Sequence, residues 1–261
     1  MKLPFFQVDA FADRPFGGNP AAVIPLEAWL PDETLQAIAA ENNLSETAFA
    51  IPATGDADYE LRWFTPTTEV ALCGHATLAS GHVLIESDAV RFRTRKAGVL
   101  IVARDGEALT LDLPVTRVAP QPHPELLSAL GLNGAEVFQS VSGAEATAII
   151  LVEDEAAVRG CQPDMRALRG IELMAIVTAP ASTEHDVVSR VFVPAWGVDE
   201  DPVTGSAHAA LAPFWAERLG RDRFTAFQAS ARGGRVAVRL AGERAILGGR
   251  CVTVIEGAFR I

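Results

Sequence analysis

Residues 62–81 read "RWFTPTTEVALCGHATLASG", a strand-like run followed by a loop that ends on Gly74 and then by a helix of small residues. The same order returns at residues 190–211 in "RVFVPAWGVDEDPVTGSAHAAL", where the glycine is Gly205. Downstream of each copy, "GVLIVARDGE" aligns without gaps with "GRVAVRLAGE". Because both matches occur in the same order, the sequence predicts an internal duplication.

Strand signals outnumber helical ones along the chain. "LTLDLPV" and "RVAVRL" alternate apolar and polar residues, and "VLIVARDGEALTLDL" predicts a hairpin closed by Asp105-Gly106. Helical patterns cover residues 32–42, 75–87 and 206–219. Short strands interleaved with a few helices predict an α+β fold.

The length of 261 residues suits two domains of ordinary size. Four prolines in "LPVTRVAPQPHPELLSALG" interrupt the pattern between a strand and a helix. We place the junction there and expect domains at residues 1–117 and 118–261.

Composition narrows the class of protein. The net charge of −11 argues against nucleic acid and anionic membranes as partners. No apolar run reaches the length of a membrane span, and the start "MKLPFFQVDAFADRPF" lacks the unbroken core of a signal peptide. Three cysteines form no disulfide framework, so we expect a cytoplasmic protein.

Duplication also predicts where chemistry occurs. If two related halves face each other, the helix starts at Gly74-His75 and Gly205-Ser206 meet in one cleft. Free backbone N–H groups and the helix dipole make each start a site for an anion, and the pair suits a small carboxylate. The alternative is that both glycines only form tight turns into their helices.

The loop "GVDEDPVTGSAH" adds polar groups beside the second helix start. Asp201 precedes a proline, which holds it extended or in a turn, where it either points into the cleft or only forms the turn. Ser206 is able to bind a substrate or to cap its helix. We expect Asp199 and Glu200 to form a solvated face.

His75 begins the first of these helices. The positive end of the dipole favours a neutral imidazole, which can accept a proton, although a lone histidine often has a structural role. His82 and His208, on the same and on the matching helix, are interpreted as structural.

Two further segments carry polar residues among apolar ones. "ENNLSETAFAIP" places Glu46 in an apolar run, which is costly unless the carboxylate is functional or paired; a capping role near Ser45 is the alternative. "FGGNPAAVI" predicts a turn between strands, at which Asn19 is able to contact a ligand.

Four motifs occur together in this chain: "FGGNPAAVIPL", "NNLSETAFA", "RWFTPTTEVALCGHAT" and "DEDPVTGSAHAAL". In order and spacing they resemble the PhzF-like (phenazine biosynthesis-like) family, most strongly over residues 5–85 and 190–215. The resemblance implies the diaminopimelate-epimerase fold: two pseudo-symmetric α+β domains, each a curved, mostly antiparallel sheet around a central helix. It also implies that the last strand, about residues 250–261, pairs back with the first domain.

The same resemblance implies roles for the residues in these motifs. Glu46 would be the catalytic base, with His75 and Asp201 as acid/base partners. Ser206 would bind substrate, and Gly74 and Gly205 would offer backbone N–H groups to its carboxylate.

Cys73 raises the question of a thiol mechanism. Related two-base epimerases use one cysteine at the start of each central helix, whereas the second-half loop "EDPVTGSAH" has none. We therefore interpret Cys73 as a small buried residue. Cys73 and His75 also lack the spaced partners that a zinc site needs, so no metal is expected.

These observations predict a cofactor-independent isomerase that moves a proton on a small, cyclic or amino carboxylate by acid/base catalysis. No dinucleotide-binding fingerprint or P-loop is present in the sequence. The alternatives are a small-carboxylate binding protein without turnover, a one-base epimerase and an oligomeric scaffold. A serine hydrolase using Ser206 is disfavoured, because "TGSAH" lacks the second glycine of its motif. We expect a homodimer.

Overall fold

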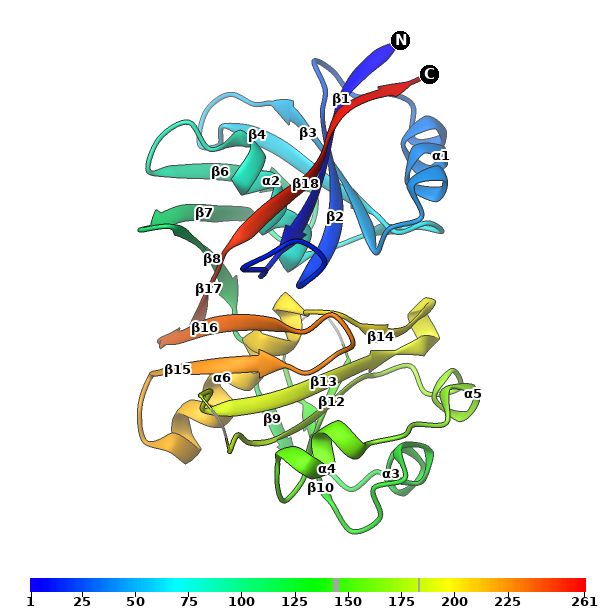
Figure 1. Cartoon of the computed structure of the whole chain (residues 1–261), viewed down its shortest axis with the longest axis vertical. Helices are drawn as coiled ribbons and strands as arrows, with labels where there is room; N and C mark the ends of the chain where they lie inside the picture. Colours follow the sequence, from blue (N-terminus) through cyan, green and yellow to red (C-terminus); the bar gives the residue numbers. More distant parts are fainter. Residues whose placement is uncertain (143–145, 183) are drawn as a thin grey trace. The chain divides into compact units, whose positions relative to one another are not determined.

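The computed structural model describes residues 1–142, 146–182 and 184–261, which form two compact units (Figure 1). The first unit holds residues 1–112 and 248–261, and the second holds residues 113–247. The chain crosses these boundaries within strands β8 (Ala108–Pro114) and β17 (Arg244–Gly249). Among the described helices, none combines the length and the apolar character that a membrane crossing requires.

The first unit is a curved sheet with two helices. Its strands are β1 (Lys2–Ala10), β2 (Asn19–Pro25), β3 (Glu46–Pro52), β4 (Tyr59–Phe64), β5 (Glu69–Val70), β6 (Ala89–Thr94), β7 (Val99–Asp105) and β18 (Cys251–Arg260). Its helices are α1 (Asp32–Asn42) and α2 (Gly74–Leu84). The strands pair in the order β18-β1-β2-β3-β4-β6-β7-β8, with β5 folded back on β4. The pairs β2–β3 and β4–β6 are parallel, and the other pairs named here are antiparallel.

The second unit has strands β9 (Val118–Pro120), β10 (Glu136–Ser140), β11 (Thr147–Leu151), β12 (Met174–Pro180), β13 (Val187–Val193), β14 (Val198–Asp201), β15 (Arg223–Gln228) and β16 (Gly234–Ala241). Its helices are α3 (Pro124–Leu130), α4 (Glu155–Gly160), α5 (Met165–Leu168), the 3₁₀ turn η1 (Pro194–Trp196) and α6 (Gly205–Leu219). The strands pair in the order β9-β10-β11-β12-β13-β15-β16, with β14 folded back on β13.

Strand directions confirm the duplication and the predicted fold class. The parallel pairs β2–β3 and β4–β6 of the first unit correspond to β11–β12 and β13–β15 of the second. The short hairpins β4–β5 and β13–β14 also correspond, and each precedes a helix that starts with glycine. Each unit is therefore a mostly antiparallel sheet built on one repeated plan.

Small residues let the sheet of the first unit close around α2. Residues Gly74–Gly81 are buried without interruption, and the helix packs against β1, β2, β3 and β7. A Cβ on Gly81 would lie 2.4 Å from Cγ1 of Val102 on β7, so glycine allows the close approach. In the second unit α6, which is likewise buried along most of its length, packs on β11 and β16.

The sequence patterns predicted the helices and strands themselves more accurately than the residues at which they begin and end. The helix predicted at residues 75–87 ends at Leu84, because Ile85 is already extended. The hairpin turn lies at Gly106 and Glu107, since Asp105 still pairs with Ala108 across the ladder. Gly106 adopts φ +61°, the left-handed conformation that this turn requires.

Candidate active site

Glu46 and His75 form the centre of a buried polar cluster in the first unit. Glu46 is the first residue of β3, beside β2, and its side chain is 17% exposed. Its Oε2 atom lies 3.0 Å from Nε2 of His75, a side chain that is only 5% exposed. Oε2 nevertheless accepts no well-directed hydrogen bond from the described residues. The carboxylate thus lies within proton-exchange distance of an imidazole.

Because α1 ends at Asn42 and Glu46 begins a strand, the alternative of a helix cap at Glu46 is wrong. Ser45 instead contacts Asn19, the first residue of β2. The strand position explains why a charged residue interrupts an apolar run. Its neighbours on β3 face the core, while its own carboxylate faces α2.

Asn19 fixes the imidazole from the other side. This fully buried amide donates from Nδ2 to Nδ1 of His75 over 3.1 Å, and its Oδ1 accepts from Ser45 Oγ, also over 3.1 Å. With Nδ1 as acceptor, a neutral His75 carries its proton on Nε2, facing Glu46. Asn19 therefore orients His75, and a contact with substrate stays a prediction.

Cys73 is the last residue before α2, with extended backbone (φ −142°, ψ 109°) and no side-chain cap. As predicted from sequence, it is buried. It is also more than a space-filling residue, because Sγ lies 3.5 Å from Nδ1 and 4.0 Å from Nε2 of His75. Glu46, Cys73 and His75 each offer one ligating atom, and these three atoms lie within 4.8 Å of one another. The spacing argument against a metal overlooked Glu46, which reaches this point from another strand.

The two glycines that begin the central helices are buried. Gly74 and Gly205 are each the first helical residue, with ordinary right-handed backbone. A left-handed turn is therefore not the reason for glycine at either position. First-turn N–H groups lack intrahelical partners, so each start is suited to an anion.

Asp201 lies at the end of β14 in a loop that Gln228 holds in place. Oδ2 of Asp201 accepts a short hydrogen bond from Thr204 Oγ1. Gln228, fully buried at the end of β15, donates from Nε2 to Asp201 O over 2.7 Å and accepts from Thr204 N over 2.9 Å. One side chain thus satisfies two backbone groups of this loop.

Ser206 does not cap α6. Thr204 occupies the N-cap position, and Ser206 is the second helical residue, half-buried, with Oγ 3.9 Å from Met174 Sδ. The capping alternative for Ser206 is therefore wrong. Substrate binding by Ser206 stays a prediction.

The two histidines interpreted as structural lie on the helix bodies. Nε2 of His82 is 3.0 Å from Thr253 Oγ1 on β18. His208 is completely buried, with Nδ1 2.7 Å from Thr204 O in the first turn of α6. Burial lowers the pKa of His208 to about 4, so this imidazole is neutral near pH 7.

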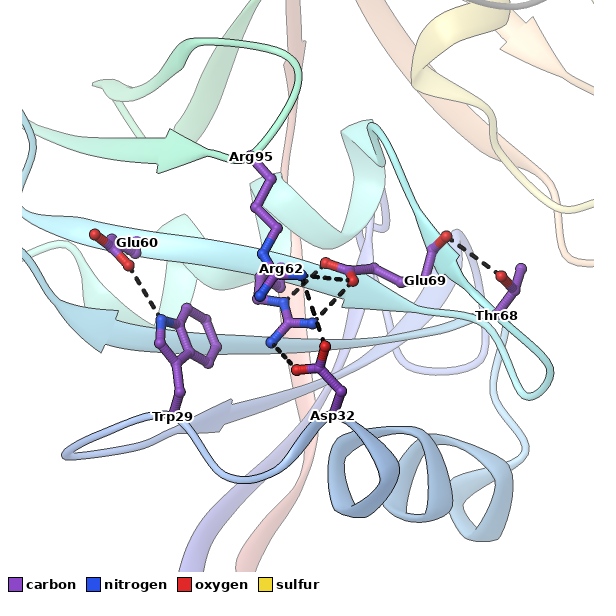
Figure 2. Close-up of polar contacts among 7 residues, drawn as sticks. All are labelled: Trp29, Asp32, Glu60, Arg62, Thr68, Glu69 and Arg95. Carbon is purple, nitrogen blue, oxygen red and sulfur yellow. Dashed lines mark hydrogen bonds and ion pairs between the residues drawn. The ribbon is translucent and has the colours of Figure 1, made fainter.

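An arginine anchors the hairpin before each helix. Figure 2 shows Arg62 of β4 held between two carboxylates. Its Nε and Nη2 donate to Glu69 at 2.8 Å each, and Nη1 donates to Asp32 at 2.8 Å. These bonds from Arg62 hold the pKa of Glu69 below its usual value. Arg95, in the turn between β6 and β7, adds a further contact to Glu69 at 3.1 Å, so β5 is held both by β4 and by this turn.

The second unit repeats this clamp. Arg190 of β13 donates from Nε and Nη2 to Glu200 of β14 at 2.8 and 2.9 Å. The prediction that Glu200 is solvated is wrong, because its side chain is 21% exposed and pairs with Arg190. Asp199, which is 54% exposed, matches the prediction and contacts Arg169.

Sequence reasoning missed Gln228 and the two clamp arginines. A signal for each was present, since Gln228 falls on a buried position of the alternating strand "RFTAFQ", and "LRWF" and "SRVF" place arginines among apolar residues. The same signal drew attention to Glu46. The contact between Asn19 and His75 has no counterpart in sequence spacing, because it joins β2 to α2.

Comparisons with known proteins agree with this architecture. The family model described as "Phenazine biosynthesis-like protein" matches residues 8–257. "Uncharacterized isomerase PA2770" of Pseudomonas aeruginosa is 49% identical over 267 residues, which is 100% of both chains. A crystal structure of a PhzF-family protein from Enterococcus faecalis has a TM-score of 0.90 and 40% identity, covering 100% of both chains. A hydroxyproline epimerase from Agrobacterium vitis, solved with bound trans-4-hydroxy-L-proline, shares the fold at a TM-score of 0.59 and 16% identity, over 99% of this chain and 91% of that one.

Fold and relatives together define an isomerase with a diaminopimelate-epimerase-like fold. The chain belongs to the phenazine biosynthesis-like (PhzF) family.

Proposed function

We propose that the protein is an isomerase that moves a proton on a small carboxylate by general acid/base catalysis without a cofactor, with Glu46 as the base. The observation that carries this proposal is the largely enclosed Glu46 carboxylate, whose Oε2 atom lies 3.0 Å from Nε2 of His75. A carboxylate in this setting is close enough to a second acid/base group to exchange protons yet is not tied up by a strong hydrogen bond.

In the proposed reaction, the Glu46 carboxylate takes a proton from a carbon activated by the carboxylate of the substrate. The electron pair of the broken C–H bond moves into the conjugated system, and Glu46 returns the proton at the far end of that system. The net change is a shifted double bond, and no oxidant or reductant is consumed.

His75 would stabilise the charge that develops during this step. Its Nε2–H faces Glu46, because Asn19 holds Nδ1 as an acceptor. A neutral imidazole that donates from Nε2 is suited to an enolate-like oxygen. Asn19 and Ser45 would act through His75 as positioning residues.

Backbone N–H groups at a helix start are proposed to bind the substrate carboxylate. The α2 start lies beside His75, and the α6 start is preceded by Asp201 and Thr204. Asp201 as a second acid/base group and Ser206 as a substrate contact are part of the proposal.

Solvent deuterium exchange tests turnover directly. The protein is incubated in D₂O with a panel of small cyclic and amino carboxylates, and deuterium incorporation is followed by mass spectrometry. We expect incorporation into at least one unsaturated carboxylate together with a shifted double bond. Incorporation at one stereocentre without a shift would support a one-base epimerase instead. Tight binding without any incorporation would support a binding protein and contradict the proposed reaction.

The compartment and the assembly complete the proposal. All three cysteines lie in described residues and are free thiols, as is usual in a reducing compartment such as the cytoplasm.

We propose a homodimer, which light scattering on the purified protein would distinguish from a monomer.

A further inference from the structure

Three side chains of different chemistry converge at the start of α2. Glu46 comes from β3, and Cys73 and His75 flank Gly74. Oε2 of Glu46 faces Nε2 of His75, and Sγ of Cys73 lies 3.5 Å from Nδ1 and 4.0 Å from Nε2 of the same ring. Carboxylate, imidazole and thiolate are the three ligand types that zinc uses in proteins.

A tetrahedral ion bound to Nε2 requires the Cys73 side chain to rotate, because Sγ lies nearer to Nδ1 than to Nε2 of His75. Bonds of about 2.0–2.3 Å place neighbouring ligand atoms roughly 3.3–3.6 Å apart in tetrahedral geometry. Nε2 and Oε2 are 3.0 Å apart, and Nε2 and Sγ are 4.0 Å apart. Each separation therefore differs from the ideal by about half an ångström. Three protein ligands leave the fourth position of the ion open to water or a substrate oxygen.

The donor set selects the class of cation. A thiolate and an imidazole favour Zn²⁺, Co²⁺ and Cd²⁺, whereas Mg²⁺ and Ca²⁺ prefer oxygen ligands. Thiolate and carboxylate bring two negative charges, which compensate the charge of a divalent ion.

Asn19 would support the imidazole in the metal-bound state. When Nε2 binds an ion, Nδ1 carries the proton and must donate it. A half-turn of the buried Asn19 amide presents Oδ1 to Nδ1 and Nδ2 to Ser45 Oγ, which is able to accept. The same two side chains therefore satisfy His75 in both states.

We propose that Glu46, Cys73 and His75 form a binding site for a thiophilic divalent cation of the zinc class. A lone pair on Oε2 of Glu46 binds the ion, and the Cys73 thiol releases its proton to solvent when the ion binds. Metal binding itself is independent of the proposed function. Its consequence, reversible inhibition of proton transfer, rests on the assignment of Glu46 as the base.

Cobalt(II) provides a spectroscopic test that needs no substrate. Purified protein, freed of metals with a chelator, is titrated with Co²⁺ and followed in the near ultraviolet. We expect one equivalent to bind, with a thiolate-to-cobalt charge-transfer band and release of about one proton. Zn²⁺ should displace the cobalt and abolish the band, and excess Mg²⁺ should leave it unchanged.

Variants assign the ligands. Cys73→Ser should remove the charge-transfer band, and the matched control Cys161→Ser, which changes a thiol bonded to Leu130 O, should retain it. Glu46→Gln should keep the band with weaker affinity. Asn19→Ala should keep the band and weaken affinity about 10–100-fold, as expected for a residue that orients a ligand. Circular dichroism on each variant verifies that it is folded.

Several outcomes would overturn the metal site: no stoichiometric binding, binding without a thiolate band, or a band that survives in folded Cys73→Ser. A folded Cys73→Ala protein serves if the serine variant is unstable. If zinc displaces the cobalt as expected but deuterium exchange continues at full rate, the metal site stands and Glu46 is not the base. The two proposals therefore fail separately.

Discussion

Substitution of Gln228 by alanine tests the structural basis of the Asp201 loop. The side chain is fully buried and bonds to the carbonyl of Asp201 and the N–H of Thr204 at 2.7 and 2.9 Å. Its Nε2 also lies 3.2 Å from Thr204 Oγ1. Removal takes away the hydrogen-bond partners of one backbone donor, Thr204 N–H, and one backbone acceptor, Asp201 C=O.

The expected loss follows from these contacts. A neutral hydrogen bond contributes about 0.5–1.5 kcal/mol, and a buried unsatisfied polar group costs about 1–3 kcal/mol. Because two main contacts disappear and at least one backbone group stays buried, we expect Gln228→Ala to lower the free energy of unfolding by about 3 kcal/mol.

Urea denaturation followed by tryptophan fluorescence measures this change. Gln121→Ala is the matched control, because Gln121 is exposed in the loop before α3 and should change stability by less than about 0.5 kcal/mol. Equal unfolding midpoints for the two variants would refute the role of Gln228 in holding the loop. Gln228→Glu adds a second comparison, since it retains an acceptor for Thr204 but has no donor for Asp201.

Two further predictions concern Arg62 and Asn19. Arg62→Met should lower the free energy of unfolding by about 2–3 kcal/mol, less than for a fully buried pair, because Asp32 is 66% exposed and is readily hydrated. Since Arg62 lowers the pKa of Glu69, this pair stabilises the fold above the unfolded-state pKa near 4.5 and loses its effect as the pH falls through the folded value. Denaturation midpoints between neutral and acidic pH should thus decline less steeply in Arg62→Met, and parallel curves would contradict this. Asn19→Ala should lower kcat about tenfold with KM nearly unchanged, because His75 loses its orienting bond. The control variant Asn133→Ala, at an exposed position, should leave both constants unchanged. Equal kcat values for the two variants would contradict the positioning role of Asn19.

The repeated stretches predicted the architecture because strand and helix periodicity reflects burial within each unit. "RWFTP" and "RVFVP" became β4 and β13, and the glycine after each loop became the first residue of a buried helix. The ends of elements were less predictable. The geometry of the turn decides where an element ends, as at Gly106. The residue types around the turn give little indication of that geometry.

Polar residues within apolar runs of the sequence indicated the candidate site, but the sequence did not indicate which residues they contact. Glu46 was visible as a carboxylate where burial is costly. Its proximity to His75, the bond from Asn19 and the third contact from Cys73 arise from packing between β2, β3 and α2. Glu200 shows the opposite error, since a charged residue in a loop was assumed to be solvated although Arg190 pairs with it.

The central claim is that Glu46 transfers the proton, and Glu46→Gln tests it most directly. Glutamine keeps the shape but cannot exchange a proton, so turnover of a carboxylate identified by deuterium exchange should fall by roughly 10²–10⁴. Affinity for the same carboxylate should remain, because the proposal assigns its binding to helix N-termini and not to Glu46. Glu41→Gln, the same change at an exposed position of α1, should leave both quantities unchanged. A folded Glu46→Gln protein that loses affinity and turnover in equal measure, or that retains turnover, would contradict the account.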